Sequence, residues 1–224
     1  SGVVFTVTEK FAPAAESGAH AFCHAVPDTW HQMGVILAAS DCISWFCEIT
    51  GADVDSLMQA FARTDPAATD LMFHPYLSGE RTPHNDANAR GGFFGLARGH
   101  AQGEMTRAIL QGVAFAIADA TDILRKAGAA PERLLATGGG AKNDTWLSYI
   151  AAVTGIPIDM PADGDFGAAL GAARLAMIAD GAGVQTVCTK PRIESTIEPD
   201  PAMAEALAPA YGRWRQIYHL LADS

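Results

Sequence analysis

RLLATGGGAKNDTWLSYIAAVTGIPID, residues 133–159, is the stretch that decides the fold. A short apolar run at 134–136 leads into three consecutive glycines, an amphipathic stretch at 145–153 and a second apolar run that ends in Asp159. This order predicts a strand, a glycine turn, a helix and a second strand, which together form a βαβ unit. Because glycines allow positive φ and let a flat ligand lie directly on the backbone, a nucleotide is the first ligand to consider.

Three nucleotide-binding motifs can be compared with this turn. A P-loop is excluded, since no Gly-x-x-x-x-Gly-Lys-Ser/Thr occurs in the chain. A dinucleotide fingerprint is incomplete: Gly138 and Gly140 fit and Asp159 stands where a ribose-binding acid would, but Asn143 takes the place of the third glycine. Asp144 falls in the predicted first helical turn, where it would cap free N–H groups and repel phosphate. The turn therefore suits the uncharged adenosine end of a nucleotide, with a plain tight turn as the alternative.

Composition limits the class of protein. The chain has 224 residues, 49% of them hydrophobic, which is enough for a substantial core in one large domain or two small ones. The net charge of −10 without any basic run makes nucleic acid an unsuitable partner. Four cysteines without Cys-x-x-Cys spacing indicate reduced, mostly buried thiols of a cytoplasmic protein: Cys23, Cys42, Cys47 and Cys188.

The ends and apolar runs of the chain bear on its location and completeness. No signal peptide is visible and no apolar run reaches the length of a membrane span, so no membrane partner is expected. The chain has no initiator Met and opens directly into a strand pattern. We interpret it as a fragment of a longer protein.

Apolar periodicity predicts the remaining elements. The expected strands cover 3–7 (buried), 19–26, 30–33 and 71–73, and the expected helices cover 35–49, 55–63, 103–127, part of 161–181 and 203–221. Residues 163–165 form an acidic loop, and residues 183–200 are predicted to be an irregular connection. His20, His24 and His31 are interpreted as structural histidines, because no carboxylate or thiolate nearby completes a ligand set.

The polar segment 75–92 is too long for a simple connection, and loops of this length are often functional. Within it, Glu80 and Arg81 either pair or face a ligand, or lie in a solvated loop, and the sequence leaves both open.

The segment 91–111, GGFFGLARGHAQGEMTRAILQ, resembles the C-terminal signature of the FGGY carbohydrate kinases. That signature is a Gly-aromatic-Gly turn, a fixed spacer and an acidic or amide residue that opens a helix. The segment 75–84, PYLSGERTPH, is similar to the xylulokinase branch of the family. Further agreement comes from Ser1-Gly2, 138–141 and 170–175.

The resemblance implies a fold and a domain organisation. It implies an α/β fold of the ribonuclease-H-like, actin and hexokinase type, with a mixed sheet flanked by helices. Residues 1–224 would be the C-terminal, ATP-binding domain, without its first segment and without the N-terminal sugar-binding domain. That N-terminal domain would be a partner across the active-site cleft, and a homodimer is left open.

The resemblance also implies site residues. Gly139 and Gly140 would pack under the adenine and ribose, Asn143 or Asp144 would close that pocket, and Ser44 would lie near the purine. Ser1 and Gly2 would be the end of the loop under the β- and γ-phosphates. No acid of this chain would be the catalytic base, an Asp expected upstream of Ser1, and no metal ligand is assigned.

The implied activity is the ATP- and Mg²⁺-dependent phosphorylation of a sugar, D-xylulose to D-xylulose 5-phosphate. A kinase for ribulose, gluconate or a polyol is the first alternative. The second, of another class, is a non-catalytic nucleotide-binding module.

Overall fold

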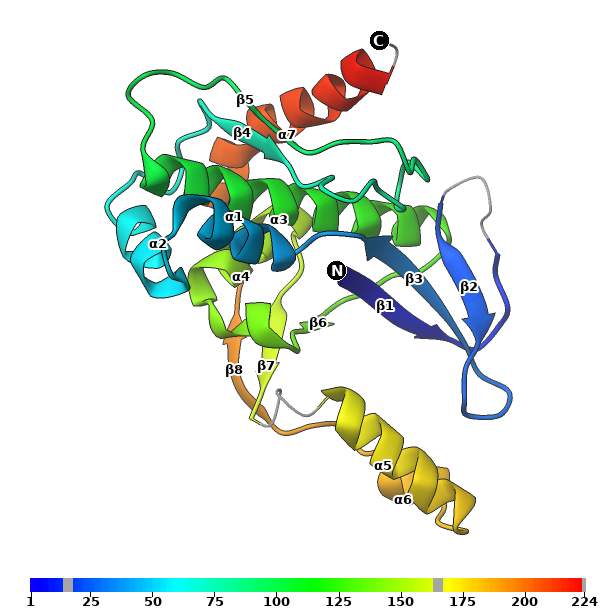
Figure 1. Ribbon diagram of the computed structural model, residues 1–224. Helices are drawn as coiled ribbons and strands as arrows, with labels where there is room; N and C mark the ends of the chain where they lie inside the picture. The colour runs from blue at the N-terminus through cyan, green and yellow to red at the C-terminus, as the bar shows by residue number, and fades with distance from the viewer. Residues whose placement is uncertain (14–17, 163–166, 223–224) are drawn as a thin grey trace.

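The structure is a computed structural model, and it describes residues 1–13, 18–162 and 167–222. Figure 1 shows one long helix, α3 (Gln102–Lys126), that runs through the molecule with the other elements arranged around it. Most residues of α3 are buried. Among the described residues, no helix combines the length and the apolar character needed to span a membrane.

The N-terminal third forms an antiparallel sheet and two helices. Three strands lie in the order β1-β3-β2: β1 (Gly2–Thr8), β2 (His20–Cys23) and β3 (Trp30–Ile36). The helices are α1 (Asp41–Thr50) and α2 (Val54–Phe61). The helix expected over 35–49 is therefore wrong in its first part, because Val35 and Ile36 complete β3 before the chain turns into α1.

The central part pairs two short strands and adds α3. β4 (Met72–His74) pairs antiparallel with β5 (Gly92–Phe94). The sequence placed the first strand one residue earlier and missed the second, whose residues belong to the Gly-aromatic-Gly turn. Compared with the expected helix over 103–127, α3 is shifted by one residue toward the N-terminus at both ends.

The C-terminal part contains the predicted βαβ unit. β6 (Leu134–Leu135) and β7 (Ile158–Pro161) are parallel, and the turn η2 (Gly139–Lys142) and α4 (Asp144–Thr154) join them. The expected irregular connection at 183–200 is partly wrong, because it contains α6 (Val184–Val187) and β8 (Ile193–Ile197), which pairs antiparallel with β7. The other helices are α5 (Gly167–Ala179) and α7 (Pro201–Ala222). The acidic loop at 163–165 lies outside the described residues.

Two glycines let α3 lie directly against strands. A Cβ atom on Gly34 would come within 2.8 Å of the Ala120 Cβ, so β3 lies against Ala120 of the helix with no room for a side chain of its own at this position. A Cβ atom on Gly112 would come within 2.1 Å of the Phe73 carbonyl oxygen in β4. The sheet and the hairpin are thereby fixed against the same helix.

The last helix, α7, is joined to β4 by a reciprocal pair of hydrogen bonds. The Trp214 indole N–H donates to the Phe73 carbonyl oxygen at 2.8 Å, and the His74 Nε2 lies 2.9 Å from the Trp214 carbonyl oxygen. Since a carbonyl only accepts, His74 carries its proton on Nε2. Burial lowers the pKa of His74 to about 4, which keeps the ring neutral. The Trp214 side chain is itself buried.

The cysteines differ from the expectation of mostly buried thiols. Cys42 is buried and Cys47 is partly buried, but Cys23 and Cys188 are exposed, and all four are free. Burial raises the pKa of the Cys42 thiol to about 12, so it is an apolar core group.

Candidate nucleotide site

The glycine turn is shaped by the residues on either side of it. Gly138 has a φ of 90°, a value that favours glycine, and a single 3₁₀ turn follows. The Asn143 side chain accepts a hydrogen bond from the Trp146 N–H at 2.9 Å and so caps α4. Asp144 lies in the first turn of α4, as expected, but the capping role expected of it belongs to Asn143.

The surface of the turn is open at Gly139 and closed at Gly140. No atom lies within 4 Å of the position that a Cβ atom on Gly139 would take. A Cβ atom on Gly140 would come within 3.0 Å of the Trp146 ring, and that ring is fixed by a hydrogen bond from its N–H to the Leu110 carbonyl. The turn therefore exposes bare backbone at Gly139. At Gly140 it packs against Trp146 of α4, which is bonded in turn to α3.

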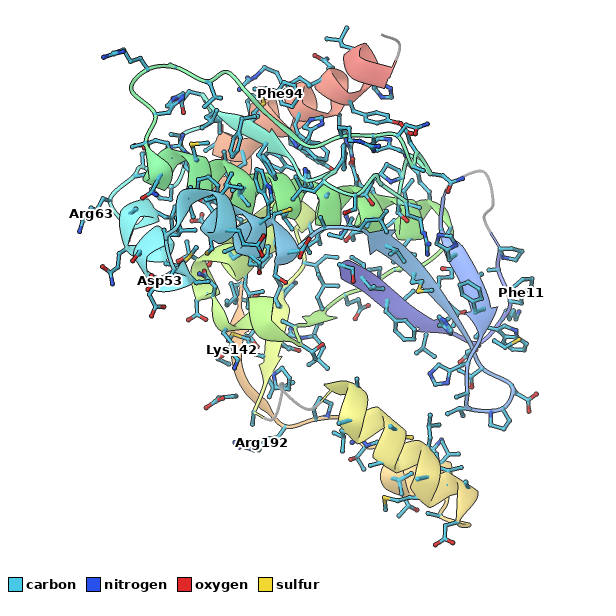
Figure 2. All side chains as sticks on the ribbon, viewed as in Figure 1. Phe11, Asp53, Arg63, Phe94, Lys142 and Arg192 are labelled. Atoms are coloured by element: carbon cyan, nitrogen blue, oxygen red, sulfur yellow. The ribbon has the colours of Figure 1, made fainter. Side chains whose placement is uncertain are left out.

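The turn lies beside α2. The Asn143 Nδ2 is 3.0 Å from the Met58 sulfur, and α2 in turn packs against α1. Figure 2 shows Asp53, the N-cap of α2, and Lys142, the last residue of η2, on the same side of the molecule. Gly139, Gly140, Asn143 and Asp144 lie together because they are neighbours in the sequence, and the turn that holds them faces α2.

The other predicted residues lie at α1. A Cβ atom on Gly2 would come within 2.9 Å of the Ala39 Cβ, which places Ser1 and Gly2 next to the segment that enters α1. Ser44 is exposed one turn into that helix. The two groups of predicted residues are therefore linked through the contact of α1 with α2.

The Asp159 carboxylate accepts hydrogen bonds from two neighbouring side chains, Arg133 and Thr196. The Arg133 Nε donates to one carboxylate oxygen at 2.7 Å, and the Thr196 hydroxyl donates to the other at 2.6 Å. These contacts, the Arg133 hydrogen bonds above all, lower the pKa of Asp159 to about 2. Asp159 therefore joins β6, β7 and β8, a contact that explains the acid without a ribose.

Glu80 is a residue whose role the sequence missed. Its side chain is buried, and its Oε1 accepts hydrogen bonds from the Leu37 N–H at 3.1 Å and the Arg81 N–H at 2.6 Å. Burial raises its pKa to about 7. The Thr82 hydroxyl accepts from the Val35 N–H at 3.0 Å, so the segment runs beside the end of β3. Glu80 thus lies neither in a solvated loop nor in a pair with Arg81, and it fixes the chain that leads into α1.

A separate open hollow of about 710 Å³ lies at the start of α3. Asp70 is one of its lining residues: one carboxylate oxygen accepts from Arg107 at 2.7 Å and the other lies 2.8 Å from the His100 Nε2. The hydrogen bond with His100 is the main reason that the pKa of Asp70 is lowered. The polar groups of this hollow mostly satisfy one another, and none of the predicted site residues lines it.

The three N-terminal histidines lie among phenylalanine rings. The Phe5 and His31 rings stack with centroids 4.8 Å apart, and Phe22 lies 5.7 Å from His31 and 6.1 Å from His20. In the part of the chain that the structure describes, no three His, Cys, Asp or Glu side chains are grouped so that they could hold a metal ion.

Comparison with known proteins places the chain in a family. The model of the FGGY family of carbohydrate kinases, C-terminal domain, matches residues 1–179. The chain belongs to this family. It is 41% identical over 224 residues to the xylulose kinase of Escherichia coli (strain K12), a match that covers 99% of this chain and 46% of that protein.

Solved structures agree. The crystal structure of a xyloylose kinase from Brucella ovis matches with a TM-score of 0.92 and 46% identity, over 99% of this chain and 46% of that one. A gluconate kinase from Lactobacillus acidophilus matches with a TM-score of 0.84 and 25% identity, over 99% and 46% of the two chains. This chain therefore spans about half the length of the relatives that it matches.

Proposed function

We propose that this chain is the nucleotide-binding, C-terminal part of an ATP-dependent sugar kinase that converts D-xylulose to D-xylulose 5-phosphate. The observation that carries the proposal is the 41% identity to a xylulose kinase along 99% of this chain. In this proposal, residues 1–224 are one domain of the ribonuclease-H-like type, as in actin and hexokinase. The sugar-binding half lies in the part of the relatives that this chain does not span.

The adenosine end of ATP would lie on the glycine turn. Gly139 exposes bare backbone against which a flat base can pack, and the Trp146 ring packs against the neighbouring Gly140. Asn143 would shape the pocket rather than bind the base, because its oxygen caps α4 and its amide nitrogen lies against Met58. The exposed Ser44 and Asp144 would border the purine.

The phosphates would lie toward Ser1 and Gly2. The backbone N–H of Gly2 and the positive end of α1 would carry part of the charge of the transferring phosphoryl group. In this proposal the Mg²⁺ ion is held mainly by the phosphates of ATP and by water, as is usual for this ion in kinases. The base that takes the proton from the sugar hydroxyl is an Asp outside this chain.

Nucleotide binding by the chain tests the site. Replacing Gly139 with Val should weaken ADP binding at least 10-fold, because the new side chain fills the space of the base without meeting any atom of the fold. Gly99→Val is the matched control, since that position is also free of neighbours within 4 Å and lies in the other hollow. Isothermal titration with ADP measures both. An unchanged dissociation constant for Gly139→Val contradicts the assignment of the adenosine site.

The sugar is tested on the full-length kinase that contains this chain. We expect the highest kcat/KM for D-xylulose in a panel that also holds ribulose, gluconate, glycerol and other polyols. Gluconate is the main competitor, because a gluconate kinase shares this fold with a TM-score of 0.84. A higher kcat/KM for any other sugar overturns the xylulose assignment and leaves the nucleotide site in place.

A further inference from the structure

The segment that leads from β3 into α1 lies under both backbone groups that are proposed to meet the phosphates. Gly2 pairs with Ile36 where β1 and β3 end together. A Cβ atom on Gly2 would come within 3.0 Å of the Ile36 Cδ1 and within 2.9 Å of the Ala39 Cβ. Figure 1 shows the N-terminus of the chain beside this segment, which then continues into α1. The position of residues 36–40 therefore sets where Gly2 and the positive end of α1 lie.

The start of α1 is not fixed by polar side chains of its own. Within the described part of the chain, the side chain of Ser40, the N-cap residue, forms no capping hydrogen bond. The two residues before it, Ala38 and Ala39, are buried but have no polar side-chain atoms. The segment therefore depends on another part of the chain for side-chain hydrogen bonds to its backbone.

Two buried polar residues, Glu80 and Thr82, supply these hydrogen bonds. The Thr82 hydroxyl accepts from the Val35 N–H at 3.0 Å, and the Thr82 N–H donates to the Val35 carbonyl at 2.9 Å. The Glu80 Oε1 accepts from the Leu37 N–H at 3.1 Å. Val35 and Leu37 are the residues directly before and after the partner of Gly2. The backbone is thus fixed on both sides of that pairing position.

Glu80 is itself fixed by the residues around it. Its backbone N–H and carbonyl each form a hydrogen bond of 2.8 Å with the backbone of Asp86. The Asp86 carboxylate accepts in turn from the Tyr218 hydroxyl of α7 at 3.1 Å. The Glu80 Oε1 also accepts from the Arg81 N–H at 2.6 Å, which sets the direction of the side chain. The carboxyl that meets Leu37 therefore belongs to a backbone that is hydrogen-bonded on its other side.

We propose that Glu80 is a positioning residue for phosphoryl transfer: through the Leu37 N–H it fixes the backbone on which Gly2 and the start of α1 meet the phosphates. This inference rests on the proposed function, because it uses the phosphate contacts assigned there. In this role Glu80 touches neither the nucleotide nor the sugar. Groups that stabilise a transition state must be placed closely, and a displacement of about 1 Å can cost about 100-fold in rate. Loss of Glu80 should therefore slow the chemical step more than it weakens nucleotide binding.

Steady-state kinetics of the full-length kinase that contains this chain test the role. Glu80→Ala should lower kcat by about 10-fold or more, because the phosphate contacts lose their support. The KM for ATP should change less than about 3-fold, since the adenosine end is bound at the glycine turn. Glu80→Gln should restore kcat to within about 3-fold of the wild type, because its amide oxygen can accept from the Leu37 N–H. A merely structural residue would show neither this split between kcat and KM nor this rescue.

Asp119→Ala is the matched control. Asp119 is also a buried acid, but its partners Tyr211 and Arg215 belong to α7. Its loss should lower the melting temperature and leave kcat unchanged. Equal losses of kcat in Glu80→Ala and in the control overturn the proposal, and so does a Glu80→Gln variant as slow as Glu80→Ala.

Thr82→Val and Thr82→Ser give a second test, which decides if circular dichroism shows that Glu80→Ala does not fold. Valine keeps the shape of threonine but offers no acceptor to the Val35 N–H, whereas serine keeps the hydroxyl. We expect a lower kcat for Thr82→Val alone, and equal kcat values for the two variants overturn the proposal. Sugar-dependent turnover of the wild type is measured first, because its absence contradicts the proposed function. With that turnover present, a wild-type kcat in Glu80→Ala contradicts only the positioning role.

Discussion

At the scale of single residues, Glu80 shows how one buried carboxyl fixes a connection near the proposed phosphate end. One oxygen accepts two backbone N–H groups, while the other is buried without a hydrogen-bond partner. Ionisation therefore places a charge in a site that only partly stabilises it, and burial raises the pKa from 4.5 to about 7.

Glu80→Gln should change how stability depends on pH. A carboxyl with a raised pKa holds its proton more tightly in the folded state, so its contribution to stability is present below pH 4.5 and is lost as the pH rises to about 7. Gln keeps an oxygen acceptor but does not titrate. Relative to the variant, the wild type should lose on the order of 1–3 kcal/mol between pH 5 and pH 8. Urea unfolding at the two pH values measures this, and a difference that stays constant with pH refutes it.

At the scale of elements, α3 and β4 lie so close together at Gly112 that no side chain fits between them. The Phe73 carbonyl accepts from the Trp214 indole and also lies 2.1 Å from where a Cβ atom of Gly112 would be. β4, α3 and α7 therefore meet at one backbone oxygen.

Gly112→Ala should destabilise the protein by about 3 kcal/mol, since the methyl group forces helix and strand apart. Gly171→Ala makes the same change in α5, where no atom lies within 4 Å, and should be neutral or stabilise by up to about 1 kcal/mol. Thermal unfolding of both variants gives the comparison. Equal effects at the two positions would show that the close contact in α3 has no energetic importance.

The elements predicted well are those specified locally. The glycine turn and the amphipathic stretch after it predict the βαβ unit, although the helix is capped by Asn143 and not by Asp144 as expected. Partners far apart in sequence were missed. Glu80 meets Leu37 across 43 positions, and β8 is an exposed strand that pairs with β7, where Thr196 contacts Asp159. β1 was predicted as buried because its residues are apolar, and only the structure shows that nothing described covers one face.

At the scale of the whole molecule, the two acids that the sequence offered for a ligand, Glu80 and Asp159, both have structural partners. Glu80 is buried and accepts two backbone N–H groups, and Asp159 forms an ion pair with Arg133. In the proposed function, this chain binds the nucleotide and the base that activates the sugar lies outside it.

This chain alone should bind ADP weakly and transfer no phosphoryl group to D-xylulose. A coupled assay of ADP release, with and without the sugar, measures it. The full-length kinase serves as the positive control. Sugar-dependent turnover by these 224 residues would show that the base lies within them.

The reciprocal hydrogen bonds between β4 and α7 have a consequence for synthesis on the ribosome. Phe73 and His74 acquire their partner only when Trp214, about 140 residues later, has left the exit tunnel. Until then a polar ring and a carbonyl oxygen, both destined for the core, remain without the groups that satisfy them. The hairpin can form early, but its final packing is a late event of translation.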